Sequence, residues 1–149
     1  MSNLSGFVKR IRDIMRNDAG INGDAQRIEQ MAWMLFLKVY DSKEEDWEFS
    51  DSNYKSIIPE ECRWRNWAKD DKSGKAMTNE VLLDFVNNKL FPTLKNLEIT
   101  PQTPMSKAIV KTTFEDANNY MKDGVQLRQV LNEIDELDLG DYEESHAFG

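Results

Sequence analysis

The chain has 149 residues, of which 40% are hydrophobic and 31% are charged, and its net charge at pH 7 is −8. This length fits one domain with its own core, and no apolar run approaches the roughly 18 residues needed to span a bilayer. Charged residues interrupt the N-terminal apolar stretch, so no signal peptide is predicted and the expected location is the cytoplasm. Cys62 and His146 are the only residues of their types, which excludes an internal disulfide and argues against any zinc site.

The charge is unevenly distributed along the chain. Residues 1–40 carry six basic and four acidic side chains, whereas residues 41–149 carry 13 basic and 23 acidic ones. Proteins that bind DNA unaided are usually basic overall. The charge therefore argues against a self-sufficient DNA-binding protein and allows a domain that lies beside DNA while other domains bind it.

The N-terminal part of the chain predicts two helices. Apolar residues at three- and four-residue spacing from Leu4 to Met15 indicate an amphipathic helix. Residues 17–20 end it, since Asn and Gly tolerate the left-handed conformation found at helix ends. A second helix is predicted to start near Asn22 or Asp24 and to run to about Tyr40.

The run Met31–Leu37 is apolar on every face, which is typical of a central buried helix. Residues 41–56 are rich in Asp, Glu, Ser and Asn and predict a solvated loop, in which Trp47–Phe49 is the only candidate for a short hairpin strand. Residues 57–59 are expected to be extended, because the residue before proline avoids helix. A short helix over residues 60–69 should follow.

The C-terminal half predicts shorter elements. After a polar loop at residues 70–76, Thr78 should cap a helix whose apolar stripe is disturbed or ended by Pro92. Short helices are predicted at Met105–Thr113 and, with a weaker pattern, at residues 116–121.

The last helix is predicted to start at Asp123, which stands in a capping-box relation to Gln126. Residues 133–144 then hold seven acids and no base, and the end of the chain carries no stop signal. The fold class is therefore all-α, a bundle of about five to seven helices with long polar loops and one minor hairpin. Residues 1–149 are expected to form a single helical domain that is the N-terminal part of a longer protein.

Two groups of basic side chains are candidate contacts for DNA or a partner protein. The first group lies on the polar face of the first helix, where an ordinary solvated face is the alternative. The second surrounds Trp64 and Trp67, whose rings could stack on bases; the alternative there is a helix with tryptophans packed inward and arginines facing water. The candidates are Lys9, Arg10, Arg12, Arg16, Arg63, Arg65 and Lys69.

No catalytic residue is predicted. Ser73–Ala76 lacks the first glycine and the Ser or Thr of a phosphate loop. The seven glycines are scattered, so the glycine-rich turn typical of dinucleotide or S-adenosylmethionine sites is missing. His146 has no recognisable nucleophile beside it. The chain is expected to bind no cofactor and no metal and to do no chemistry by itself.

The stretch Gly20–Lys38 resembles the start of the M (modification) subunit of type I restriction-modification systems. Weaker resemblances to the same family follow along nearly the whole chain, at Ile58–Pro59, Trp64–Ala68, Asn88–Pro92, Leu127–Leu131 and Ser145–Gly149. The resemblance implies a parent protein that transfers a methyl group from S-adenosylmethionine to the N6 atom of adenine in DNA. The catalytic Asn-Pro-Pro-Phe motif of that family is missing, because no two of the four prolines are adjacent and none follows Asn.

The resemblance further implies a helical domain that helps to enclose DNA and contacts other subunits. Its expected partners are DNA, a second M subunit, an S (specificity) subunit and an R (restriction) subunit, with no membrane involved. Two alternatives stay open at this point. One is a helical protein-interaction module with no DNA role, and the other is a small stand-alone enzyme.

Overall fold

The structure is a computed structural model that describes residues 4–137. It is all-helical, with no strand in that range, so the predicted fold class is confirmed and the predicted hairpin is wrong: Trp47–Phe49 is helical. The helical elements are α1 Leu4–Met15, α2 Gly23–Ser50, the 3₁₀ turn η1 Glu60–Cys62, α3 Trp64–Trp67, α4 Asn79–Phe85, the π-helical turn η2 Val86–Leu90, α5 Phe91–Lys95, α6 Met105–Glu115 and α7 Gly124–Glu136.

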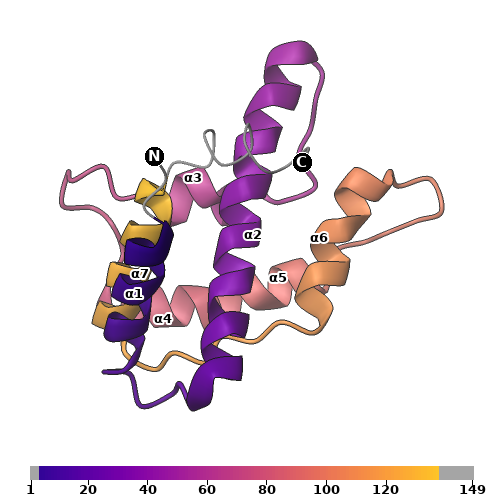
Figure 1. The fold of residues 1–149 in the computed structure, drawn as a ribbon. Coiled ribbons are helices and arrows are strands. Elements are labelled where there is room, and N and C mark those ends of the chain that lie inside the picture. The colour runs from indigo at the N-terminus through magenta and orange to yellow at the C-terminus, as the bar shows by residue number, and fades with distance from the viewer. Residues whose placement is uncertain (1–3, 138–149) are drawn as a thin grey trace.

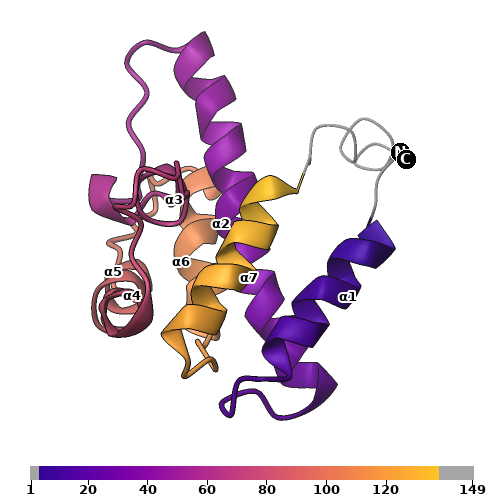
Figure 2. The same cartoon turned by 90° about the vertical axis from the view of Figure 1, so that its left-hand side faces the viewer.

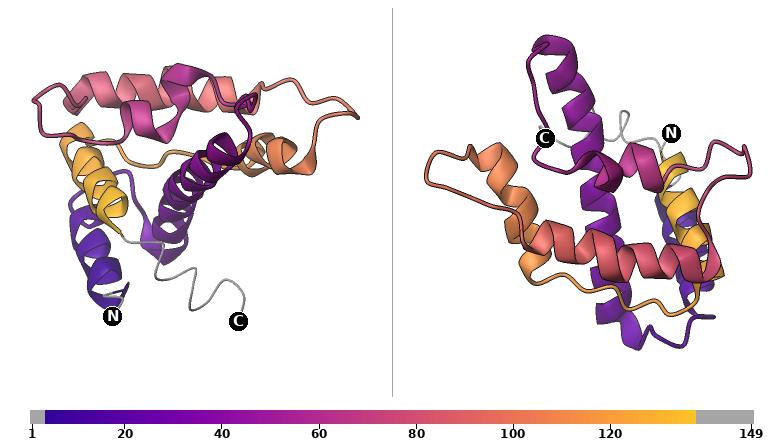
Figure 3. Two further views of the ribbon diagram at one scale, coloured as in Figure 1. Left: turned by 90° about the horizontal axis from the view of Figure 1, so that it is seen from above. Right: turned by 180° about the vertical axis from the view of Figure 1, so that it is seen from behind.

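Helix α2 is the axis around which the other elements are arranged (Figure 1). Helices α1 and α7 lie side by side on one flank of α2, and α6 lies on the other (Figures 1 and 2). The segment α4–η2–α5 forms one rod that crosses α2, as the views from above and behind show (Figure 3). The C-terminal end of α2 stands clear of the body as a projecting arm, here defined as residues 41–50. None of the helices within residues 4–137 is long and apolar enough to cross a membrane.

The core is centred on Trp33, which is 1% exposed. Its ring meets Phe91 of α5, Phe114 of α6 and Trp67 of α3, with centroid distances of 4.9, 6.3 and 6.5 Å. The central position predicted for Met31–Leu37 is confirmed, but not its burial on every face, since Ala32 is exposed.

The predicted loop at residues 41–56 is wrong over residues 41–50, because α2 continues without interruption to Ser50, and it is confirmed over residues 51–56. No glycine or proline lies between Asp24 and Ser50, and Lys43, Glu44 and Glu45 are good helix formers. Three of the acidic side chains that suggested solvent, Asp41, Glu44 and Glu48, instead face two arginines, described below. The acidic residues of this segment therefore indicate ion pairs with arginines and not a loop.

Pro92 does not end its helix. The Phe91 N–H donates to the Val86 carbonyl five residues earlier, which is the π-helical pattern of η2. Pro92 then occupies the first turn of α5, where a missing N–H costs little. The wider π-helical turn accommodates Pro92 without ending the helix, and the α4–η2–α5 rod continues to Lys95.

The weakly predicted helix at residues 116–121 is also wrong. Two distant side chains accept hydrogen bonds from backbone N–H groups at the end of this segment and just after it. Gln30 Oε1 accepts from Tyr120 at 2.7 Å, and Asp18 accepts from Lys122 and Asp123 at 2.9 Å each. These bonds compete with helix formation and hold an extended strap against α1 and α2. Gly20 lies under the strap, where an added Cβ would lie 1.9 Å from the Tyr120 carbonyl oxygen.

The cap of α7 is confirmed, since the Asp123 carboxylate accepts from the Val125 and Gln126 N–H groups. The return half of the predicted capping box is replaced, because the Asp123 N–H donates to Asp18. The predicted helix at residues 60–69 forms as η1 and α3, which are separated by Arg63. The acidic run beyond Leu137 and the segment Ser145–Gly149, with His146, lie outside the described residues.

Candidate nucleic-acid and subunit interface

A shallow groove runs between α1 and the first turns of α2, with a volume of about 480 Å³. The short connection after α1 places the start of α2 beside it. Positions 8 and 12 share one face of α1, and Arg16 follows on that face just beyond its end, where its N–H still donates to the Arg12 carbonyl. The groove is lined by Val8, Arg12, Arg16, Asp24, Arg27, Ile28 and Met31.

The groove carries three guanidinium groups and one carboxylate. Arg12 makes no ion pair with any side chain of residues 4–137, and Arg16 lies 3.8 Å from Asp13 with both side chains at least half exposed. Arg27 pairs with Asp24, its neighbour one turn earlier. The Arg16–Asp13 pair is exposed, and Asp24 is exposed in the other pair, so both pairs contribute little and are screened by salt. The groove therefore presents a net positive charge to an incoming ligand.

Lys9 and Arg10 lie outside this groove. Lys9 pairs with Asp13 at 3.5 Å, and Arg10 Nε donates to Glu133 Oε1 of α7 at 2.5 Å. Of the four candidates on the first helix, the structure thus brings only Arg12 and Arg16 together. It adds Arg27, which is not among the seven candidates. The sequence could have indicated Arg27, because a short connection after an amphipathic helix places the start of the next helix beside the last turn of the first.

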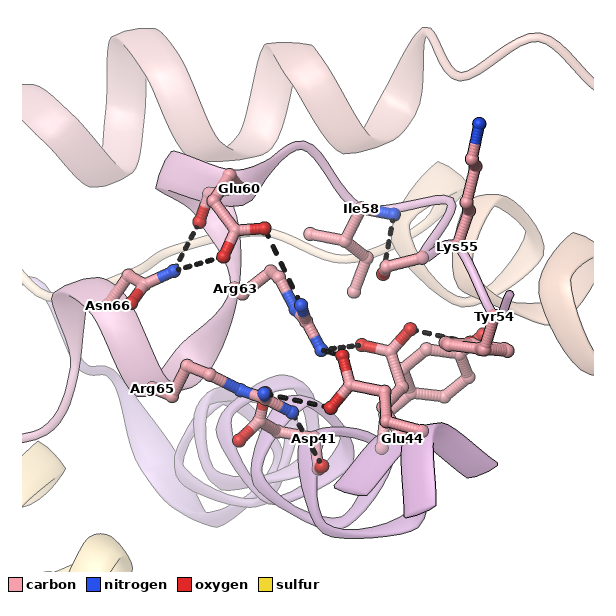
Figure 4. Close-up of polar contacts among 12 residues, drawn as sticks. Asp41, Glu44, Tyr54, Lys55, Ile58, Glu60, Arg63, Arg65 and Asn66 are labelled. Carbon is pink, nitrogen blue, oxygen red and sulfur yellow. Dashed lines mark hydrogen bonds and ion pairs between the residues drawn. The ribbon is translucent and has the colours of Figure 1, made fainter. Parts of the chain in front are cut away.

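The two arginines of the second candidate group form ion pairs with acidic residues of the same chain. Figure 4 shows the side chains of Arg63 and Arg65 directed at the carboxylates of the projecting arm. Arg63, only 6% exposed, reaches Glu48 at 2.7 Å and Glu44 at 3.6 Å. Arg65 reaches Asp41 and Glu48 at 2.9 Å each. We call these five side chains the arm clamp.

The arm clamp changes the protonation behaviour of its members. The hydrogen bond from Arg63, with help from Arg65, lowers the pKa of Glu48 below its ordinary value. Burial is the first cause that raises the pKa of Tyr54, and its hydrogen bond to Glu44 Oε2 at 2.6 Å is the second. Glu44, which is fully buried, thus keeps a guanidinium and a phenol as its partners.

The tryptophans of α3 pack inward, as the ordinary interpretation predicts. Trp64 and Trp67 are each 3% exposed, and their indole N–H groups donate to Asp135 and to the Cys62 carbonyl. Their rings offer no open face for stacking on bases. The expectation that the arginines beside them face water is wrong, because Arg63 and Arg65 form the arm clamp.

Lys69 lies in a different place from the groove. It is exposed and lines a hollow of about 320 Å³ beside the loop after α3, together with Arg65 and Lys75. Lys69 makes no ion pair within the part of the chain that the structure describes. Six of the seven candidates therefore divide among the groove, the α1–α7 contact, the arm clamp and this loop, and Lys9 pairs with Asp13 on the exposed surface of α1.

The tip of the arm is apolar and acidic. Phe49 is 94% exposed, and Glu45 and Asp46 lie one turn before it on the same face of α2. The rings of Tyr40, Trp47 and Tyr54 pack against one another beside the arm, edge-on between Tyr40 and Trp47 at 5.6 Å and tilted between Trp47 and Tyr54 at 5.8 Å. This end of α2 repels phosphate and suits a protein contact.

Comparison with known proteins identifies a family and relatives that this chain resembles. A family model described as the HsdM N-terminal domain matches residues 4–134. The chain is 45% identical over 146 residues to the type I restriction enzyme EcoEI methylase subunit of Escherichia coli, which covers 98% of this chain and 29% of the relative.

Two solved structures share the fold. One is a modification subunit assigned to a type I restriction enzyme of Vibrio vulnificus YJ016, with a TM-score of 0.85 and 29% identity over 97% of this chain and 32% of that one. The other comes from work on complex assembly and conformational transition of the type I R-M system, with a TM-score of 0.76 and 31% identity over 92% of this chain and 26% of that one.

The chain spans between about a quarter and a third of the length of these relatives. The helical core, the family match over almost all described residues and the 45% identity agree with one another and with the resemblance in the sequence. The chain therefore belongs to the HsdM N-terminal domain family, the helical domain of type I restriction-modification modification subunits.

Proposed function

We propose that this chain is the non-catalytic N-terminal domain of a type I restriction-modification DNA adenine-N6 methyltransferase subunit, which helps to enclose DNA and to assemble with other M and S subunits. The observation that carries the proposal is the groove between α1 and α2, where Arg12, Arg16 and Arg27 lie together on a domain of this family. Guanidinium groups are the side chains best suited to contact phosphate oxygens.

The charge of the chain limits what this contact does alone. Three arginines neutralise about three phosphates at most, which corresponds to a salt slope of about −3 in the logarithmic plot of affinity. The net charge of −8 opposes the same contact at longer range. The domain therefore closes over DNA that the rest of the complex holds.

Methyl transfer is assigned to the remainder of a longer subunit. In this proposal S-adenosylmethionine and the target adenine bind outside residues 1–149, since the chain corresponds to 29% of the EcoEI methylase subunit. No described residue is given a catalytic role. The partners proposed for the assembled complex are a second M subunit, an S subunit and, when restriction follows, an R subunit.

The alternative is a helical protein-interaction module with no DNA role. The projecting arm favours it, because Phe49 is almost fully exposed and is flanked by Glu45 and Asp46. A rigid aromatic side chain of this kind is typical of an interface anchor. The two functions use opposite ends of α2, so they can be separated by mutation.

The test is fluorescence anisotropy of a labelled DNA duplex titrated at several salt concentrations, with the 149-residue chain and with the longer subunit assembled with its S subunit. The groove variant carries Arg12→Ala, Arg16→Ala and Arg27→Ala. A matched control removes three exposed lysines elsewhere, Lys55, Lys72 and Lys89.

The proposal expects weak binding by the wild-type chain and tighter binding by the assembly. The groove variant should lose about two to three units of salt slope in the assembly, whereas the lysine control should keep the wild-type slope. Equal losses in both variants would show a general charge effect and would remove the groove from the DNA contact. Unchanged binding and methylation by the groove variant would favour the interaction module.

A further inference from the structure

The groove between α1 and α2 has a mixed chemistry that phosphate alone does not match. Three guanidinium groups and one carboxylate line it, but so does Ile28, which is 66% exposed. Phosphate oxygens pair with the arginines and gain nothing from an exposed isoleucine. The groove volume of about 480 Å³ is ample for an aromatic ring, since a cavity of about 150 Å³ holds benzene. A surface that presents carboxylates beside one aromatic side chain would match it better.

The tip of the projecting arm is a surface of this kind. We define the arm tip as Glu45, Asp46 and Phe49. Phe49 is 94% exposed, and the two exposed acids lie one turn before it on the same face of α2. Lys43, the basic residue of the arm, lies about a third of a turn away from Phe49 around the helix. The arm tip and the groove are therefore complementary both in charge and in apolar character.

The arm tip cannot enter the groove of its own molecule. Helix α2 is unbroken from Gly23 to Ser50, and Phe49 follows Ile28 by 21 residues, which is about 32 Å along the helix axis. Figure 1 shows the arm at the end of α2 opposite the connection from α1. An arm tip that fills this groove has to belong to a second molecule.

A second copy of this chain supplies the matching surface. Identifying it as the occupant rests on the proposed function, in which two M subunits share one complex. Six helical turns take about 22 residues, so Ile28 and Phe49 face nearly the same side of α2. Two copies with antiparallel α2 helices can therefore make the contact twice and close as a dimer. Each copy carries a net charge of −8, so association requires a contact that joins regions of opposite sign.

We propose that the arm tip of one copy binds in the groove between α1 and α2 of a second copy. Phe49 covers Ile28, and the carboxylates of the arm tip pair with the groove arginines. One aromatic anchor and a few ion pairs cover less area than a stable dimer needs. Free copies therefore associate weakly, and a complex that holds two M subunits strengthens the contact by raising its effective concentration.

This contact excludes DNA from the groove. The carboxylates of the arm tip occupy the same guanidinium groups that phosphates would use, so DNA has to displace the arm tip before it reaches them. The contact between copies therefore belongs to the DNA-free state. Weak DNA binding by the 149-residue chain then has a specific cause beside its net charge.

The direct test is intermolecular paramagnetic relaxation enhancement. A nitroxide is attached to one batch of chain at Ser50→Cys, next to Phe49, while Cys62 stays unlabelled because it is fully buried. This batch is mixed with isotope-labelled wild-type chain, whose amide signals are recorded. We expect those of Arg12 and Ile28 to be broadened several-fold more than those of Lys72 and Glu98, which are exposed elsewhere. Equal broadening at all four positions, or none, would overturn the inference.

A charge swap decides whether the two surfaces meet each other. One variant reverses the groove with Arg12→Glu and Arg16→Glu, and the other reverses the arm tip with Glu45→Lys and Asp46→Lys. In sedimentation velocity runs, each variant alone should associate less than wild type, and an equal mixture should associate more than either. A general effect of net charge would instead leave the mixture between the two pure variants, which would contradict the pairing.

The apolar part of the contact has its own matched control. Phe49→Ala should weaken self-association several-fold, because the groove loses the ring that covers Ile28. Met105→Ala removes a side chain of α6 that is 87% exposed and lies outside both surfaces, and it should leave self-association unchanged. Equal losses in the two variants would show nonspecific hydrophobic association and would overturn the inference.

Addition of a DNA duplex separates this inference from the proposed function. If the duplex reduces the selective broadening, DNA and the arm tip compete for the groove as proposed. If the broadening is selective but the duplex leaves it unchanged, the contact between copies stands and the DNA role of the groove fails. If there is no selective broadening, the contact fails whatever the DNA affinity is, and the arm tip is left to a different subunit.

Discussion

The two ends of helix α2 use arginine in opposite ways. At its N-terminal end, Arg12, Arg16 and Arg27 line an open groove, and their carboxylate neighbours are few and exposed. At its C-terminal end, Arg63 and Arg65 are enclosed by Asp41, Glu44 and Glu48 in the arm clamp.

The difference shows that the surroundings of a basic residue, and not its presence, decide its role. Asp41, Glu44 and Glu48 recur at three- and four-residue spacing, so they form one acidic stripe along α2. That stripe fixes the arginines that follow and converts them into structural side chains. No such stripe faces Arg12, which leaves it available to a ligand.

The largest effect on stability is expected from a substitution that breaks the arm clamp. Arg63→Ala leaves Glu44 fully buried without its guanidinium partner, so we expect the free energy of unfolding to fall by about 3 kcal/mol. Urea denaturation followed by tryptophan fluorescence measures it. Lys69→Ala is the control, since Lys69 is exposed and should change stability very little. A loss no larger than that of the control would mean that the clamp is not structural.

A smaller effect is expected from the phenol that completes the clamp. Tyr54→Phe removes the hydrogen bond to Glu44 Oε2 and leaves a buried carboxylate oxygen unsatisfied, at a cost of about 2 kcal/mol. Tyr120→Phe removes the same kind of bond, from Tyr120 to Glu29, at an exposed site and should have little effect. Equal unfolding midpoints for the two variants would argue against burial as the source of the difference.

The clamp should also make stability depend on acid pH. Arg63 lowers the pKa of Glu48 in the folded chain, so this carboxylate contributes stability above its ordinary pKa and loses it as pH falls through the lowered value. From about pH 5 downward, the stability gap between wild type and Glu48→Gln should therefore narrow. Denaturation at a series of pH values measures the gap. A constant gap would show that Glu48 is not held ionised by the clamp.

The smallest expected effect on folding lies at the other end of α2. Arg12→Ala combined with Arg16→Ala should leave the thermal unfolding midpoint close to that of wild type, because both side chains are exposed and Arg12 has no partner within residues 4–137. Differential scanning calorimetry measures the midpoint. A loss comparable with that of Arg63→Ala would make the groove arginines structural and would remove the contrast between the two ends.

Several elements could be predicted because their signals are local. The helices Leu4–Met15 and Gly124–Glu136 show a regular apolar stripe, and Asp123 caps the second of them as expected. The resemblance to the modification subunits was also visible in the sequence, and the family match confirms it. Of the groove residues, Arg12 and Arg16 were candidates and Arg27 was not.

The errors arose where a distant residue decides a local outcome. Residues 41–50 look like a loop until Arg63 and Arg65 are placed opposite their carboxylates. Residues 116–121 look helical until Asp18 and Gln30 take the backbone N–H groups of the strap. Pro92 looks like a helix end because periodicity does not reveal a π-helical turn before it.

The sequence by itself determined the all-helical class, the faces of the amphipathic helices and the family, because each follows from residue types at short spacing. Only the tertiary structure decided which charges are neutralised, since Arg65 meets Asp41 across 24 residues and Asp18 meets Lys122 across 104. Pairing over such separations depends on how the helices pack around Trp33, which no local pattern encodes. The arm clamp and the open groove are therefore properties of the fold, although their side chains can all be read in the sequence.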